Sequence, residues 1–126
     1  MKRRNFIASA GLLASTETFN AAAKKPLLHH VFFWLNNPES EADKNALIAG
    51  LNTLRAIPSI QRMHVGVLAS TEKRDVVDTS WDVSEIMFFN DAAGQKVYQD
   101  HPIHMEFVKN CAHLWKKVLV YDAQDV

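Results

Sequence analysis

The sequence has very little cysteine, glycine or proline, and no excess of charge of either sign. Of its 126 residues, one is cysteine, four are glycine and four are proline, while 14 basic residues balance 14 acidic ones. The single cysteine, Cys111, excludes an internal disulfide, so stability must come from packing. A chain that is 48% hydrophobic and 22% charged at this length is typical of one globular domain.

The first 23 residues have the pattern of an export signal. A basic start with Arg3 and Arg4 precedes a modestly apolar run over residues 7–14, and three alanines at 21–23 come just before Lys24. This order predicts a signal peptide over residues 1–23, and the paired arginines suggest the twin-arginine route for folded proteins. We therefore expect a periplasmic or otherwise exported protein, with no stable membrane span after cleavage. The general secretory route and a retained lipid-facing tail are the alternatives.

Residues 24–126 have no charge pattern that would attract a polyanion. Residues 1–23 hold three basic residues and one acidic residue, so their removal leaves 11 basic and 13 acidic ones. The resulting net charge of −2 argues against nucleic acid as a partner. A domain this short has a limited core, and a second copy of the chain is the simplest source of further burial.

The hydrophobic pattern predicts an α+β fold with the order β-α-β-β-α-β. Helices are indicated from Asn37-Pro38 to Ile57-Pro58, and from Asp91 to about His113 with a bend at His101-Pro102. Strands are indicated over residues 28–35, 60–69, 81–90 and 116–122. This order is that of a ferredoxin-like fold, in which both helices lie on one face of a four-stranded antiparallel sheet.

The first predicted strand is apolar on both of its faces. Val31 and Phe33 point to one side, and Phe32 and Trp34 point to the other. Because the helices cover only one face of the sheet, large apolar side chains would remain bare on the other, which monomers rarely tolerate. We expect a homodimer whose two sheets close on each other around a two-fold axis.

The segment from Tyr98 to His104 is the most plausible place for chemistry. Pro102 suits the first position of a helix, with His101 at the N-cap and His104 in the first turn. The positive end of the helix dipole disfavours a protonated ring, so His104 is expected to be a neutral base, with the Tyr98 hydroxyl aimed at the same space. The alternative is a purely structural cap beside a half-buried tyrosine.

On these residues the chain resembles the stress-responsive dimeric α/β-barrel proteins, the Dabb family. The resemblance extends from about Leu28 to Tyr121 and places such a domain at residues 24–126. Its most specific part is Tyr98-x-x-His101-Pro102-x-His104 after the third strand. The other matching features are His30 with the apolar residues that follow it, the helix that ends in Ile57-Pro58, and the segment Asp78 to Trp81. The resemblance implies a ferredoxin-like fold and a homodimeric barrel.

The resemblance also implies roles for particular residues. Plant members of the family include stress-induced proteins without an assigned reaction and a cofactor-independent polyketide cyclase that makes olivetolic acid. In that cyclase, a tyrosine and the second histidine of the His-Pro-x-His element form the acid-base pair. Tyr98 and His104 match them and are the expected catalytic residues. His30 matches a histidine that lines the pocket, and we expect His30 and His101 to contact the substrate. No cofactor is implied.

Three functional hypotheses follow from these features. The first is an exported stress-response type protein that binds a small apolar or aromatic molecule in a cavity beside the barrel. The second is a cofactor-independent cyclase or isomerase that acts on a polyketide-like substrate through Tyr98 and His104. The third is a metal site built from His29, His30, His101 and His104. Because neighbouring residues of a strand point to opposite faces, His29 and His30 cannot both join it, and no metal site is expected.

The export signal predicts a mature N-terminus near Lys24. Mass spectrometry of protein recovered from the cell envelope should find this terminus. Replacing both Arg3 and Arg4 with lysine should block export if the twin-arginine route is used. A full-length species confined to the cytoplasm would contradict the prediction.

Overall fold

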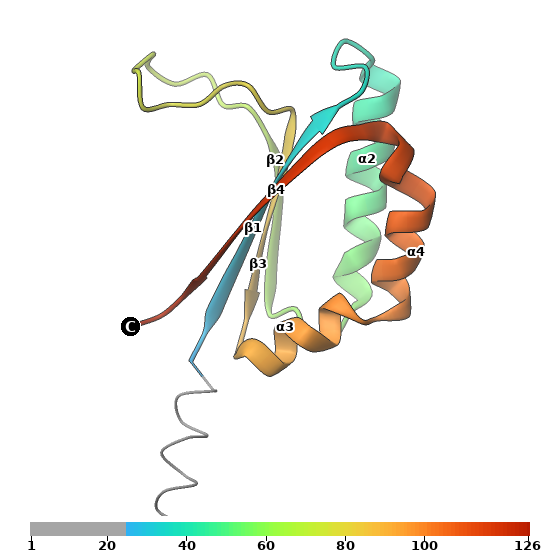
Figure 1. The fold of residues 1–126 in the computed structure, drawn as a ribbon, viewed down its shortest axis with the longest axis vertical. Coiled ribbons are helices and arrows are strands. Elements are labelled where there is room, and N and C mark those ends of the chain that lie inside the picture. The colour runs from blue at the N-terminus through green and yellow to red at the C-terminus, as the bar shows by residue number, and fades with distance from the viewer. Residues whose placement is uncertain (1–24) are drawn as a thin grey trace, which may run out of the picture.

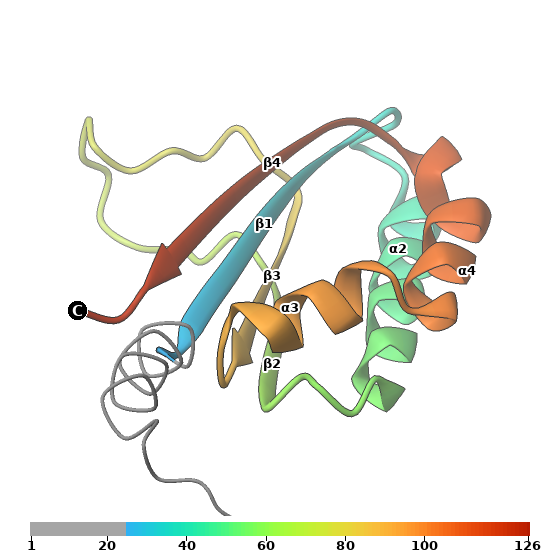
Figure 2. The same ribbon diagram turned by 60° about the horizontal axis from the view of Figure 1, so that its bottom comes forward.

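The computed structural model describes residues 25–126, in which helices cover one face of an antiparallel sheet (Figures 1 and 2). The predicted signal peptide therefore lies outside the described residues. The strands are β1 (Leu27–Leu35), β2 (Arg62–Val67), β3 (Val83–Phe89) and β4 (Trp115–Gln124). The helices are α2 (Glu41–Thr53), α3 (Ala92–Gln99) and α4 (Pro102–Cys111), with the 3-10 turns η2 (Leu54–Ala56) and η3 (Ala112–Leu114).

The sheet has the strand order β2-β3-β1-β4, and every neighbouring pair is antiparallel. Strand β1 therefore lies between β3 and β4, and the edge strands of the sheet are β2 and β4. Strands β1 and β2 are joined through α2, and β3 and β4 through α3 and α4, as two interleaved β-α-β units. This arrangement confirms the predicted ferredoxin-like fold.

Side-chain caps begin the helices, although the first helix starts later than predicted. The Ser40 hydroxyl accepts a hydrogen bond from the Asp43 amide at 3.1 Å, which makes Ser40 the N-cap of α2. The prediction that Asn37-Pro38 opens this helix was wrong, because the Asn37 carbonyl accepts from the Ser40 amide in a turn before it. Asp91 caps α3 as predicted, by accepting from the Gly94 amide at 2.7 Å.

The core lies between the sheet and the helices. Leu47, Leu51 and Leu54 form the predicted stripe on the first helical segment, and none of the three has any exposed surface. Helices α2 and α4 run side by side (Figure 1). They approach closely at Gly50, where a side chain would clash with the sulfur of the buried Cys111. Glycine is therefore required for this contact between the helices.

Within residues 25–126, no helix covers the opposite face of the sheet (Figure 2). It carries the partly exposed aromatic side chains Phe32, Trp34, Phe88 and Tyr121, in the predicted alternation. Trp81, from the loop before β3, packs edge-on against Phe32 with ring centroids 5.3 Å apart. An apolar surface of this extent is typical of an interface.

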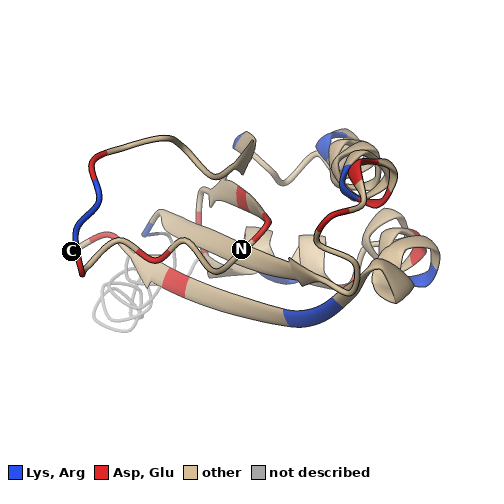
Figure 3. Ribbon diagram, turned by 90° about the horizontal axis from the view of Figure 1, so that it is seen from above, with Lys and Arg blue, Asp and Glu red and all other residues tan. Residues whose placement is uncertain are grey.

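Two basic side chains lie on rings of this face: the Lys117 ammonium is 4.4 Å from the centroid of the Trp34 ring, and the Arg62 guanidinium is 5.2 Å from that of Phe88. Figure 3 shows Lys, Arg, Asp and Glu in short separate bands along the described chain, with no block of one sign. None of the helices within residues 25–126 has the length and apolarity needed to cross a bilayer.

The open sheet face predicts a dimer that a single charge would disrupt. Light scattering on residues 24–126 should give about twice the monomer mass, and Phe32→Glu should give a monomer, because a buried unpaired charge costs several kcal/mol. Val76→Glu is the matched control, since Val76 is 81% exposed in the loop between β2 and β3. A wild-type protein that stays monomeric at micromolar concentration would contradict the prediction.

Candidate functional site

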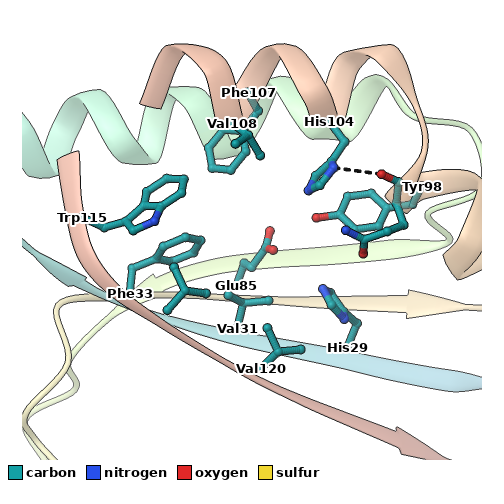
Figure 4. A pocket seen from close by; sticks show the side chains of 12 residues that line it. His29, Val31, Phe33, Glu85, Tyr98, His104, Phe107, Val108, Trp115 and Val120 are labelled. Atoms are coloured by element: carbon teal, nitrogen blue, oxygen red, sulfur yellow. Dashed lines mark hydrogen bonds between the residues drawn. The ribbon is translucent and has the colours of Figure 1, made fainter. Parts of the chain in front are cut away.

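A cavity of about 190 Å³ lies between the sheet and helix α4, beside the edge strand β4. Its apolar walls are formed by Val31, Phe33, Phe107, Val108, Trp115, Val118 and Val120. Its mouth carries exposed residues of both kinds: Val108, Val118 and Val120 are each between 38% and 43% exposed, and the polar Gln99 is exposed as well. Five polar residues, His29, Glu85, Tyr98, Gln99 and His104, line the remaining part (Figure 4).

The junction between α3 and α4 positions two of these groups. Pro102 occupies the start of α4, and the His101 ring caps the helix by accepting a hydrogen bond from the Ile103 amide at 3.1 Å. This cap brings His104 in the first turn of α4 against Tyr98 in the last turn of α3. Their ring centroids lie 4.7 Å apart. The predicted roles of Pro102 and His101 in this junction are confirmed.

His104 has a defined tautomer and a free acceptor. Its Nδ1 lies 3.1 Å from the backbone oxygen of Gln99, and since a carbonyl can only accept, Nδ1 carries the hydrogen. Burial lowers the pKa of His104 and outweighs the opposing effect of the Gln99 bond, and nearby His29 also lowers the pKa. The ring is therefore neutral near pH 7, and its Nε2 presents a lone pair. Burial is the cause, where the sequence had suggested the helix dipole.

Tyr98 is a buried hydrogen-bond donor. It is 2% exposed, and its ring packs against Phe89 and His29, with centroids 5.6 Å away in each case. Burial raises the pKa of the Tyr98 hydroxyl far above its ordinary value, and the proximity of Glu85 and Asp122 adds to the effect. The phenol therefore keeps its proton at any physiological pH. The structure thus brings a protonated phenol, Tyr98, and a neutral imidazole, His104, together at one cavity.

The histidine of β1 that lines the cavity is His29, and not the predicted His30. His29 shares the helix-facing side of β1 with Val31, and its Nδ1 lies 2.5 Å from an Asp122 carboxylate oxygen on β4. His30 points to the open sheet face, where its ring lies 4.2 Å from that of Phe32. A shift of one residue along a strand exchanges its two faces, which is why the choice between adjacent histidines matters.

His101 is also absent from the cavity lining, since its ring is used as the helix cap. Of the four site residues predicted from the sequence, the structure brings Tyr98 and His104 into the cavity and leaves His30 and His101 outside it. The four histidines considered for a metal site do not converge, and within residues 25–126 no group of three potential ligands gathers.

Glu85 is the cavity residue that the sequence analysis missed. It stands on β3 among the helix-facing residues Val83, Met87 and Phe89, and it is 2% exposed. Its Oε2 has no hydrogen-bond partner within the described chain, and burial raises the pKa of the carboxyl to about 8. Glu85 is therefore an uncharged acid near neutral pH. The sequence could have predicted this residue, because Glu85 falls on the same side of the strand as the apolar residues Val83, Met87 and Phe89.

A family model of the stress responsive A/B barrel domain, Dabb, matches residues 27–125. The chain belongs to the Dabb family. The resemblance seen in the sequence is thereby confirmed. No curated protein sequence matches this chain.

Several solved structures are similar to this Dabb protein in fold, at low sequence identity. A Dabb family protein with a ferredoxin-like fold from Mesorhizobium loti has a TM-score of 0.66 and 22% identity, over 81% of this chain and 98% of that one. A dimeric ferredoxin-like protein of unknown function from Thermobifida fusca has a TM-score of 0.64 and 19% identity, over 79% and 91%. The hydroxynitrile lyase from Passiflora edulis has a TM-score of 0.67 and 18% identity, over 82% and 95%.

The burial of Glu85 predicts a distinct pH dependence of stability. In the folded protein, the raised pKa of about 8 keeps the carboxyl protonated in a range where the unfolded chain, with its ordinary pKa of 4.5, has lost the proton. Stability due to this proton is complete below pH 4.5 and is lost as the pH rises to about 8, a change on the order of 5 kcal/mol. The Glu85→Gln variant has no ionisable group at this position, so its stability lacks this pH dependence.

The melting temperature of Glu85→Gln relative to wild type should therefore increase between about pH 5 and pH 8 and then level off. Glu72→Gln, in the exposed loop between β2 and β3, should follow wild type throughout. A constant difference between Glu85→Gln and wild type over this range would show that Glu85 titrates as an ordinary surface acid.

Proposed function

We propose that this Dabb protein binds a small aromatic molecule in the cavity between the sheet and helix α4. The observation that carries the proposal is a cavity with apolar walls and five polar residues in its lining. Such a combination is the usual composition of a small-molecule site. The apolar walls would hold the ring, and the polar atoms would fix its orientation.

The size of the cavity favours a molecule with one ring. An engineered cavity of about 150 Å³ lined by apolar side chains binds benzene. The cavity here, about 190 Å³, leaves room for one ring with a small polar substituent. The lone pair of His104 Nε2 and the hydroxyl of Tyr98 supply an acceptor and a donor for that substituent. A ring that carries a hydroxyl or carbonyl group suits them best.

The proposal includes assembly as a homodimer. Similar structures from Thermobifida fusca and Bacteroides fragilis are described as dimeric ferredoxin-like proteins. The aromatic face of the sheet supports the same assembly here, because it has no cover within the described chain. Since the cavity lies on the helix side of the sheet, each protomer would keep its own site.

A second candidate function is acid-base catalysis without a cofactor. The specific observation in its favour is the contact between the rings of His104, which is neutral with its hydrogen on Nδ1, and Tyr98, whose hydroxyl is protonated. His104 would remove a proton from carbon next to a carbonyl group, and Tyr98 would stabilise the enolate oxygen that forms. Ring closure or isomerisation of a polyketide-like substrate needs this pair of groups. The hydroxynitrile lyase from Passiflora edulis shows that this fold can carry an enzyme.

Export of the protein is also part of the proposal. It is supported by the arginine pair, the apolar run and the three alanines at the N-terminus. A site that needs no cofactor and no disulfide would function in an envelope compartment without further components.

Conservative variants of the two facing residues test the binding function. His104→Gln and Tyr98→Phe are close in size to the originals and should leave the melting temperature nearly unchanged. Each variant should bind p-cresol about 3- to 10-fold more weakly, the factor for one neutral hydrogen bond, and should bind toluene like wild type. Titration calorimetry measures both ligands. If a substrate is found, turnover should fall about 10²- to 10⁴-fold in the same variants.

His113→Gln, at an exposed position of η3, is the matched control and should change neither binding nor stability. If Tyr98 and His104 were only structural, the variants would lose stability, because a buried group left without its partner costs about 1–3 kcal/mol. Reduced stability together with unchanged p-cresol binding would contradict the proposal.

A further inference from the structure

Glu85 occupies a position that packing alone does not explain. It lies in the middle of β3, opposite Val31 on β1 and Val65 on β2, on the side of the sheet that faces the helices. Methionine or leucine would fill the same space without a polar atom. The Oε2 atom is buried and has no hydrogen-bond partner within the described chain. Buried polar groups nearly always have a partner, so the missing one is expected from outside the chain.

Among the described residues, no lysine or arginine lies beside Glu85 to hold it as an anion. His29 on β1, Tyr98 on α3 and His104 on α4 share the cavity with it, and Asp122 on β4 lies next to His29. Helix α2 contributes the buried leucines Leu47 and Leu51. No lysine or arginine is among the residues that line the cavity. The carboxyl is therefore maintained in its uncharged form, in which it can donate a hydrogen bond.

The hydroxyl of Tyr98 faces the same part of the cavity. Figure 4 shows the Tyr98 oxygen and the Glu85 carboxyl turned toward each other, Glu85 from the sheet and Tyr98 from α3. Both groups are protonated donors, and a carbonyl oxygen has two lone pairs that could accept from both. A tyrosine beside a protonated carboxylic acid is a known way to bind an oxygen that gains negative charge.

We propose that Glu85 and Tyr98 form a two-donor site for the carbonyl oxygen of an aromatic aldehyde or ketone, and that Glu85 thereby excludes carboxylates from the cavity. The inference rests on the ligand-binding function proposed above and names its substrate class. A carbonyl compound receives two hydrogen bonds in this site. A carboxylate of the same size adds a negative charge to a cavity that no lysine or arginine of the described chain lines, and in which the His29 ring is already paired with Asp122.

Three ligands that share a methylphenyl group test this specificity by calorimetry. They are 4-methylbenzaldehyde, p-toluate and toluene, and no lysine lines the cavity to react with the aldehyde. Near pH 6.5, wild type should bind the aldehyde at least about 10-fold more tightly than p-toluate. Glu85→Met should bind the aldehyde about 3- to 10-fold more weakly than wild type and toluene equally well.

Two further measurements distinguish a binding role of Glu85 from a purely structural one: the pH dependence of aldehyde binding and the infrared spectrum of the bound aldehyde. Ionisation of Glu85 should weaken aldehyde binding by wild type up to about 10-fold between pH 7 and pH 9, whereas Glu85→Gln should show no such change. The carbonyl stretch of the bound aldehyde should lie at lower frequency in wild type than in Glu85→Met, because two donors polarise the bond. Glu72→Gln, in the exposed loop, should match wild type in every measurement.

The two proposals fail in different ways. If wild type binds none of the three ligands, the cavity is not a site for one-ring aromatic molecules, and the function and this inference both fall. The inference alone is overturned if wild type binds these ligands and the Glu85→Met and Glu85→Gln variants behave like it. Behaving like wild type means the same preference for aldehyde over p-toluate, the same pH dependence of binding and the same carbonyl frequency. Should Glu85→Met fail to fold, the pH dependence of Glu85→Gln decides the question.

Discussion

Strand β1 is hydrogen-bonded along both edges, and most of the structure depends on which way its side chains point. Because β3 and β4 hold it on either side, its backbone cannot rotate, and its residues alternate strictly between the helices and the open sheet face. His29, Val31 and Phe33 thus form the floor of the cavity. Phe32 and Trp34 form the middle of the surface that we expect to meet a second copy. One strand therefore serves the proposed site and the proposed interface at once.

Much of this architecture could be predicted from the sequence, because it depends on local patterns. Alternation located the strands, the cap at Asp91 and the His101-Pro102 junction located the later helices, and the leucine stripe identified the buried side of α2. Tyr98 and His104 were predicted to meet because both lie within one turn of a junction whose geometry proline restricts. The predicted start of α2 was wrong because two N-cap signals, Asn37-Pro38 and Ser40, lie close together. The first belongs to the turn at Asn37, and Ser40 caps the helix.

The rest of the site depends on contacts between distant segments. His29 and His30 are identical in local chemistry, and only the pairing of β1 with its neighbours shows which one faces the helices. Glu85 could have been found from the alternation of β3, but its significance comes from burial beneath helices that lie before and after it in the chain. The carboxylate beside His29 is contributed by Asp122, 93 residues later. Such relations are tertiary, so no short pattern contains them.

The mouth of the cavity has a consequence for how ligands would be exchanged. It opens between α4 and the outer strand β4, past Val108, Val118 and Val120, on the side of the sheet away from the open aromatic face. Two protomers joined through that aromatic face would therefore leave both mouths in contact with solvent. A ligand could enter or leave without separation of the subunits, and each protomer would fill on its own. Dimer formation would then stabilise the sheet without changing ligand affinity, and the occupancy of the two cavities would follow a simple saturation curve.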